Sequence, residues 1–144
     1  MKKIFIIALI VVLLITFAYY WRSKLSVKVD IDNHIFYVDV AVTPSQKELG
    51  LGYRDSMAQD HGMLFPYDHP EQYSFWMKGM RFPLDMIWIR DKTIIDITKN
   101  IPVATSDYLP TYSPHVPADK VLEVNAGTTD RLNIKVGDAI KILF

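Results

Sequence analysis

The chain has 144 residues, with 16 basic and 16 acidic side chains and no cysteine. This length allows one ordinary domain plus a short N-terminal segment, and the missing cysteine excludes disulfides, thiol nucleophiles, thiolate metal sites and a lipid-bearing cysteine. The residues after position 21 hold 14 basic and 16 acidic side chains, a net charge of −2, so we expect no nucleic-acid partner, which would need a basic face.

The first 21 residues predict a segment directed to the membrane. Residues 4–21 carry no charge, and 18 apolar or nearly apolar residues are about the shortest run that spans the hydrocarbon core. The aromatic cluster at residues 19–21 favours an uncleaved signal anchor, because such residues lie at membrane interfaces. A cleaved signal peptide, cut after Thr16-Phe17-Ala18, is the alternative.

The remaining chain is predicted to form a tether at residues 22–26 and a single β-rich domain at residues 27–144. A short N-terminal tail followed by a whole domain places that domain outside the cytoplasm. We therefore expect a single-pass membrane protein with an extracytoplasmic domain in the cell envelope, or a secreted or periplasmic protein if the signal is cleaved.

Alternating apolar and polar residues predict a β-hairpin at the start of the domain. Its strands are Leu25–Ile31 and Ile35–Val42, with the turn pair Asp32-Asn33 between them. Thr43 is then expected to cap a short helix that has Pro44 in its first turn and Gln46 as the partner in a capping box. Glycines at positions 50 and 52 end that helix.

The stretch Tyr73–Arg90 carries two apolar runs, 75–77 and 86–89, that predict buried strands on either side of a polar turn. Both of its tryptophans, Trp76 and Trp88, are assigned to the core. Further predicted elements are strands at 93–99, 121–125 and 139–144, a long Pro-rich loop at 100–117, and one or two helical turns at 126–132 with Thr128 as N-cap. These elements indicate a mostly β (α+β) fold, a small compact barrel-like domain with one or two short helices.

Six motifs occur in order along this domain: Gly50-Leu51-x-Tyr53-Arg54, Gly62-Met63-Leu64-Phe65, Phe75-Trp76-Met77-Lys78, Pro83-Leu84-Asp85, Val121 to Gly127, and Gly137-Asp138. Together they resemble the bacterial and archaeal family known as domain of unknown function 192, over about residues 27–144. The resemblance implies a small β-rich domain, often exported or anchored, and no particular activity. The chain has Gly52 where the family usually has Met, and Gly79-Met80 where it usually has Asn-Thr.

Four charged residues that match the family, each at the end of an apolar element, are candidates for a shared site: Arg54, Lys78, Asp85 and Glu123. One interpretation makes Asp85 and Glu123 a carboxylate pair, with Arg54 and Lys78 holding an anionic or polyhydroxy ligand. The other makes all four structural ion pairs and turn hydrogen bonds. Tyr108 and Tyr112, in the Pro-rich loop, are candidates for stacking on a sugar or peptide.

Two functions follow from these candidates. The first is a non-enzymatic binding or accessory module of the cell envelope, with a polysaccharide, peptide or protein partner at the Tyr108–Tyr112 loop and the Lys78–Asp85 turn. The alternative is a small glycan-directed hydrolase that uses Asp85 and Glu123. No H-x-x-H or H-E-x-x-H spacing and no Gly-rich phosphate loop is present, so we expect neither a metal nor a cofactor.

Overall fold

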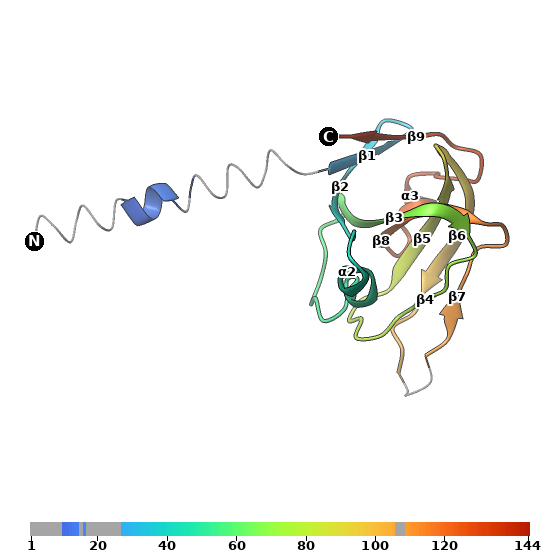
Figure 1. Cartoon of the computed structure of the whole chain (residues 1–144), viewed down its shortest axis with the longest axis horizontal. Coiled ribbons are helices and arrows are strands. Elements are labelled where there is room, and N and C mark those ends of the chain that lie inside the picture. The colour runs from blue at the N-terminus through green and yellow to red at the C-terminus, as the bar shows by residue number, and fades with distance from the viewer. Residues whose placement is uncertain (1–9, 15, 17–26, 106–108) are drawn as a thin grey trace, which may run out of the picture.

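The computed structural model describes residues 10–14, 16, 27–105 and 109–144 (Figure 1). Residues 10–14 and 16 are helical, and the domain that follows is mostly β. Its elements in chain order are β1 (Val27–Ile31), β2 (His34–Val40), α2 (Pro44–Leu49), β3 (His61–Glu71), β4 (Phe75–Trp76), β5 (Leu84–Arg90), β6 (Thr93–Ile101), β7 (Thr111–Tyr112), β8 (Ala118–Asn125), α3 (Thr128–Arg131) and β9 (Ile140–Leu143).

Seven strands form one sheet in the order β6-β5-β8-β3-β2-β1-β9, and β4 pairs with β7 in a separate two-stranded ribbon. The sheet curls until its two edges meet, since Thr93 at the start of β6 forms an isolated bridge with Ala139 just before β9. Two backbone hydrogen bonds between Ile94 and the turn at residues 137–138, both 2.9 Å long, reinforce this junction. The expected barrel-like, mostly β architecture is therefore confirmed, as a sheet closed at one end.

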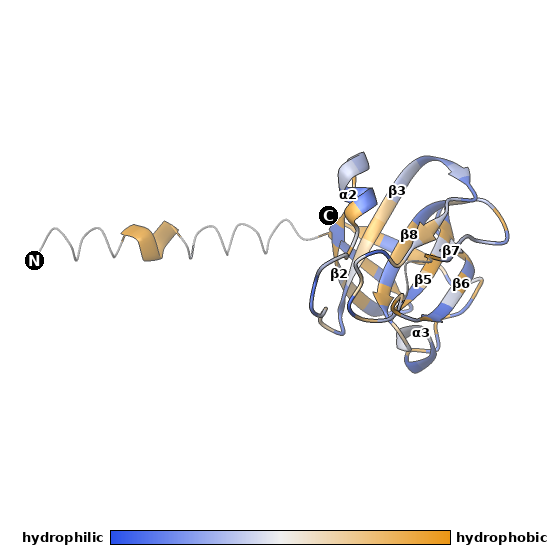
Figure 2. Cartoon of the chain, turned by 90° about the horizontal axis from the view of Figure 1, so that it is seen from below, coloured by the Kyte–Doolittle hydropathy of each residue, from blue (hydrophilic) through white to orange (hydrophobic). Residues whose placement is uncertain are grey.

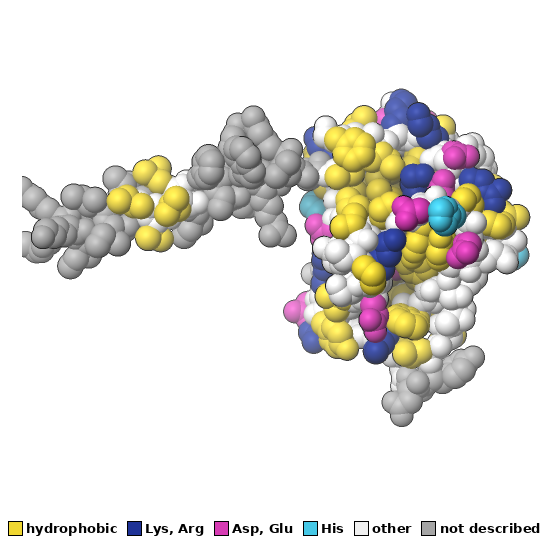
Figure 3. Space-filling model, viewed as in Figure 1, with side chains coloured by type: hydrophobic (Ala, Val, Ile, Leu, Met, Phe, Trp, Pro, Cys, Tyr) yellow, Lys and Arg dark blue, Asp and Glu magenta, His cyan; other side chains and the backbone are white. Residues whose placement is uncertain are grey.

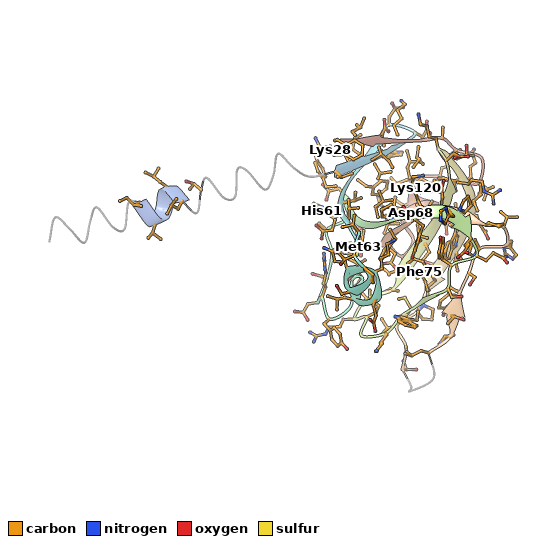
Figure 4. The ribbon with its side chains drawn as sticks, in the orientation of Figure 1. Lys28, His61, Met63, Asp68, Phe75 and Lys120 are labelled. Atoms are coloured by element: carbon orange, nitrogen blue, oxygen red, sulfur yellow. The ribbon has the colours of Figure 1, made fainter. Side chains whose placement is uncertain are left out.

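The sheet buries both of its faces, and successive residues of its central strands alternate between two apolar clusters. The first cluster, inside the curl, contains Leu64, Ile87, Leu122 and Val124 together with residues of β1, β2 and β9. The second contains Met63, Phe65, Met86, Trp88 and Val121, and it is covered by the ribbon β4–β7 and by the segments 51–57 and 77–82. Figure 2 shows the apolar colour along β3, β5 and β8, and Met63 and Phe75 of the second cluster are labelled in Figure 4.

Several predicted elements are confirmed at the level of individual contacts. β1 and β2 form the expected antiparallel hairpin, and β6 pairs antiparallel with β5. The capping box of α2 is complete, because the Thr43 hydroxyl accepts from the Gln46 amide at 3.2 Å and the Gln46 side chain accepts from the Thr43 amide at 2.9 Å. Gly50 ends this helix with a φ of 52°.

Three expectations need correction. Thr128 does not cap α3 but is its first residue, because Gly127 in the left-handed conformation takes the N-cap position. The Pro-rich segment 100–117 is not all loop, since it contributes β7. Trp76 is 43% exposed, because β4 spans only two residues and faces the solvent at that position, whereas Trp88 is fully buried as predicted.

The expected signal anchor or signal peptide at residues 1–21 falls mostly on positions outside the described residues, and the tether at residues 22–26 lies wholly outside them. Within the ranges that the structure describes, no helix is long and apolar enough to cross a membrane.

Candidate functional site

The four charged candidates do not converge on one site. Arg54 lies on the surface and pairs with Asp39 at 2.8 Å, with both side chains about half exposed. Asp85 is buried beneath the start of α3, whereas Lys78 and Glu123 line one pocket on the other face of the sheet. The structure thus brings two of the four together, and these two define what we call the Glu123 pocket.

Asp85 is a structural carboxylate. Its oxygens accept hydrogen bonds from the amides of Asn100 (2.8 Å), Gly127 (3.2 Å) and Thr129 (2.9 Å), and from the Thr129 hydroxyl (2.8 Å). These donors come from the end of β6 and from the N-cap and first turn of α3, so one fully buried side chain fixes both segments to β5. Because its acceptor positions are taken by the protein, Asp85 has no obvious capacity left for a ligand.

The register between β5 and β8 separates the two carboxyl groups. Asp85 lies opposite Val124, and Met86 lies opposite Glu123. Side chains of paired residues share a face of the sheet, and the next pair along points to the other face. Asp85 therefore lies on the inner face of the curled sheet, and Glu123 lies on the covered outer face. The predicted carboxylate pair does not exist in this fold.

Glu123 lies at the centre of the sheet, between Met63 of β3 and Met86 of β5. Its side chain is only 5% exposed, and no group in the described part of the chain donates a hydrogen bond to its carboxyl. Burial alone raises the pKa of Glu123 from 4.5 to about 8, because the ionised form loses its water without gaining a partner. At neutral pH this group is therefore mostly a carboxylic acid, which can both donate and accept a hydrogen bond.

The carboxyl of Glu123 lines a pocket of about 210 Å³. The pocket lies between α2, β3 and β4, and its walls are mainly apolar and aromatic, from Leu49, Leu51, Phe65, Tyr67, Phe75, Trp76 and Met80. A cavity of about 150 Å³ is large enough for a benzene ring. This pocket therefore has room for one ring and a polar group.

The end of α2 forms one side of the pocket. A Cβ on Gly50 would lie 3.5 Å from Cζ of Phe65 and 4.0 Å from Oε2 of Glu123, so the backbone here approaches the carboxyl closely. The φ of 52° at Gly50, which glycine adopts without strain, turns the chain from the helix across the pocket. The capping box that fixes the start of α2 thus also positions this wall.

A second loop holds Lys78 beside the pocket. The amide of Tyr53 donates to the carbonyl of Gly79 at 2.7 Å, and the Tyr53 ring lies so close to Gly79 that a Cβ there would be 2.9 Å from it. Gly79 is therefore needed for this contact, and Met80 adds an apolar side chain to the pocket wall.

The two lysines of the pocket differ in what they already contact. Nζ of Lys47 donates to the carbonyl of Pro66 at 2.5 Å and lies 3.9 Å from the centroid of the Tyr67 ring, so the protein itself holds this charge. Nζ of Lys78 lies 5.9 Å from the centroid of the Trp76 ring, and no carboxylate of the described residues is within ion-pair distance of it. Lys78 is thus the cation with capacity for a ligand.

Of the two tyrosines predicted to stack on a ligand in the Pro-rich loop, the structure describes only Tyr112. Tyr112 pairs with Phe75 in the β4–β7 ribbon and packs, partly buried, against the second apolar cluster. Tyr108 lies outside the described residues. Instead, Tyr67 lines the pocket and stacks on Tyr73 with 3.6 Å between ring centroids. Burial and the nearby Tyr73 and Glu123 raise the pKa of Tyr67 to about 12, so it stays a neutral phenol.

Most of the pocket was not foreseen from the sequence. Gly50, Phe65 and Trp76 belong to motifs recognised in the chain, but their convergence depends on how the segments 50–57 and 73–82 pack against β3 and the rest of the sheet. Among the described residues, no group of three His, Asp or Glu side chains is arranged to hold a metal ion. On the face drawn in Figure 3, apolar side chains lie among scattered charges of both signs.

Fold and site together define a small β domain, a curled sheet closed at one end with a ligand-sized pocket on its covered outer face. The chain belongs to the family of domain of unknown function 192 (DUF192), described as "Uncharacterized ACR", whose model matches residues 27–142. The resemblance seen in the sequence is thereby confirmed.

Two solved structures are similar to this chain. One is of a protein from Sinorhizobium meliloti 1021, described as a "putative transcription regulator", with 40% identity, coverage of 81% of this chain and 91% of that chain, and a TM-score of 0.70. The other is of a protein of unknown function from Novosphingobium aromaticivorans DSM 12444, with 29% identity, coverage of 81% and 83%, and a TM-score of 0.72. No curated protein matches the chain.

Proposed function

We propose that this domain is a non-enzymatic binding module that holds a small ligand, or one ring or side chain of a larger partner, in the Glu123 pocket. One observation carries the proposal: a buried carboxyl group without a donor from the described residues lines a pocket of ligand size. The Glu123 oxygens are not among the enclosed polar atoms that lack a partner in the described residues, so the carboxyl opens onto the pocket, where a ligand can reach it. A carboxyl with a perturbed pKa in a cleft is a candidate for ligand binding.

The pocket favours binding over catalysis. Its described lining contains no histidine, and its one serine, Ser74, shares a hydrogen bond of 3.0 Å with Ser113. Besides Glu123, the only acid in the lining is the exposed Glu48 on α2. The described lining therefore offers Glu123 no histidine and no activated nucleophile to work with.

We also propose that residues 1–21 attach the domain to the outer side of a membrane, with a cleaved signal as the alternative. The charge-free run and its aromatic end support this location. A polysaccharide, peptide or protein of the cell envelope would then be the partner. Cell fractionation followed by protease treatment of intact cells tests this part: the domain should stay with the membrane and be degraded from outside, and a protected soluble protein would contradict it.

Methionine methyl groups offer a direct test of ligand binding. In the full chain labelled with [methyl-13C]Met, Met80 reports on the pocket, whereas Met57 is outside its lining. Small fragments that enter the pocket should shift the Met80 signal and leave the Met57 signal in place. If a library of several hundred fragments at millimolar concentration leaves Met80 unchanged, the pocket is not a binding site.

A further inference from the structure

The chemistry of the Glu123 pocket also limits the class of ligand, and this further step rests on the binding role proposed above. The pocket offers three kinds of contact: aromatic and apolar walls, the carboxyl of Glu123, and the side chain of Lys78. Each restricts a different part of the ligand, namely its body, its hydrogen-bonding groups and its charge.

The walls fit a flat apolar body. Phe65 and Phe75 meet edge to face with 5.0 Å between ring centroids, and Phe75 meets Trp88 in the same way at 5.5 Å, so these rings are held rigidly by the core. Trp76 lines the pocket and remains 43% exposed. Rigid aromatic walls favour a planar ring, because stacking and edge contacts need no further ordering of the protein.

The charges of the lining favour an anionic ligand over a cationic one while Glu123 is protonated. The ionisable groups that line the pocket besides Glu123 are Lys47 and Glu48 on α2, Tyr67 on β3 and Lys78 after β4. Tyr67 is neutral, and Glu48 offsets only one of the two lysines, so the pocket carries an excess of one positive charge while Glu123 is protonated. The unpaired Lys78 would repel a ligand cation and attract an anion.

We infer that the Glu123 pocket takes a small organic anion with a flat apolar body, such as an aromatic carboxylate. The apolar body lies between Phe65, Phe75 and Trp76, and the anionic group interacts with Lys78. The carboxylic acid of Glu123 donates a hydrogen bond to an acceptor of the same ligand. A ligand that needs this donor binds only to the protonated protein, so its affinity falls once Glu123 ionises, because the donor is lost and a negative charge appears in the pocket.

Three probes with the same ring and different head groups test this assignment: benzoate (anionic), benzamide (neutral) and benzamidine (cationic). Each is titrated into the full chain in a mild non-ionic detergent, and the Met80 methyl signal gives the affinity. Benzoate should bind, benzamide should bind more weakly and benzamidine should not bind. The affinity for benzoate should be constant between about pH 5.5 and about pH 7, where the probe is ionised, and fall about tenfold per pH unit above about pH 8.

Three variants assign the effect to named side chains. Lys78→Met should weaken benzoate binding about tenfold or more, whereas Lys135→Met, a matched removal of an exposed lysine in the turn before β9, should leave it unchanged. Glu123→Gln keeps a donor at the same place, so it should bind benzoate at low pH and lose the decline at high pH.

The possible outcomes separate the two proposals. If benzamidine or benzamide shifts Met80 and benzoate does not, the pocket remains a binding site but the anion assignment is wrong. The assignment is equally overturned if Lys78→Met binds benzoate as well as the wild type, or if Glu123→Gln retains the pH dependence. If no probe and no library fragment shifts Met80, both the assignment and the proposed function fail.

Discussion

Replacing Glu123 by glutamine should remove a large pH dependence from the stability of the domain. Burial raises the pKa of Glu123 from 4.5 to about 8 in the folded chain, and unfolding returns the group to water. Between these two pH values the folded protein holds a proton that the unfolded chain does not, so the free energy of unfolding decreases as the pH rises.

The size of the effect follows from the shift. Well inside this window, each pH unit changes the free energy of unfolding by about 1.4 kcal/mol. The dependence is weaker close to each of the two pKa values, so the total change between about pH 5 and about pH 8 is about 3–4 kcal/mol. Above about pH 8, folding no longer depends on the pH through this group. The Glu123→Gln variant should therefore be more stable than the wild type at high pH by several kcal/mol.

Urea unfolding of the full chain, followed by tryptophan fluorescence, which changes when the buried Trp88 becomes exposed, measures this dependence at a series of pH values. The difference between the wild type and Glu123→Gln cancels the contributions of the other ionisable groups. Glu71→Gln, at an exposed position at the end of β3, is the matched control and should leave the pH dependence as in the wild type. A difference between wild type and Glu123→Gln that stays constant from about pH 5 to about pH 8 would refute a buried, unpartnered carboxyl.

The remaining predictions concern stability and use the same unfolding assay. Asp85→Asn should destabilise the domain by about 3–5 kcal/mol, because an amide nitrogen would then face backbone donors; a loss below about 1 kcal/mol would contradict its structural role. Arg54→Ala should cost less than about 1 kcal/mol, since its ion pair is exposed, and a larger loss would show a partner not seen here. Gly62→Ala should cost about 1–3 kcal/mol, because its Cβ would lie 2.6 Å from a carbonyl of β8, and a neutral result would mean that the two strands separate easily. Gly50→Ala should cost about 1–3 kcal/mol through its positive φ, and unchanged stability would show that the chain relaxes there.

Local sequence signals predicted the elements that depend on local contacts. The hairpin of β1 and β2 follows from alternation and a turn pair, and the start of α2 follows from the Thr43 and Gln46 side chains. Thr128 was misplaced by one residue because a left-handed glycine can cap a helix without a side-chain hydrogen bond. Trp76 was assigned to the core because the short apolar run 75–77 shows no alternation with polar residues. Such a run does not show which of its side chains faces outward.

The site depends on contacts that the sequence does not specify. Asp85 and Glu123 were grouped because each is an acid at the end of an apolar run, but the register of β5 and β8 decides their faces, and a shift of one residue would reverse the result. The structural interpretation is supported for Asp85, and the ligand-binding one is favoured for Glu123. Lys78 and Glu123 line one pocket only because the segments 51–57 and 73–82 pack over this face of the sheet.

The most direct test of the pocket is the titration of Glu123 itself. In the full chain labelled with 13C at the glutamate side-chain carboxyl, the signal that is absent in Glu123→Gln reports its ionisation. We expect a midpoint near pH 8, and a higher midpoint when benzoate is bound, because the ligand favours the protonated acid. A midpoint near pH 4.5, the ordinary value for a glutamate, or a midpoint lowered by benzoate, would contradict the proposed role of Glu123.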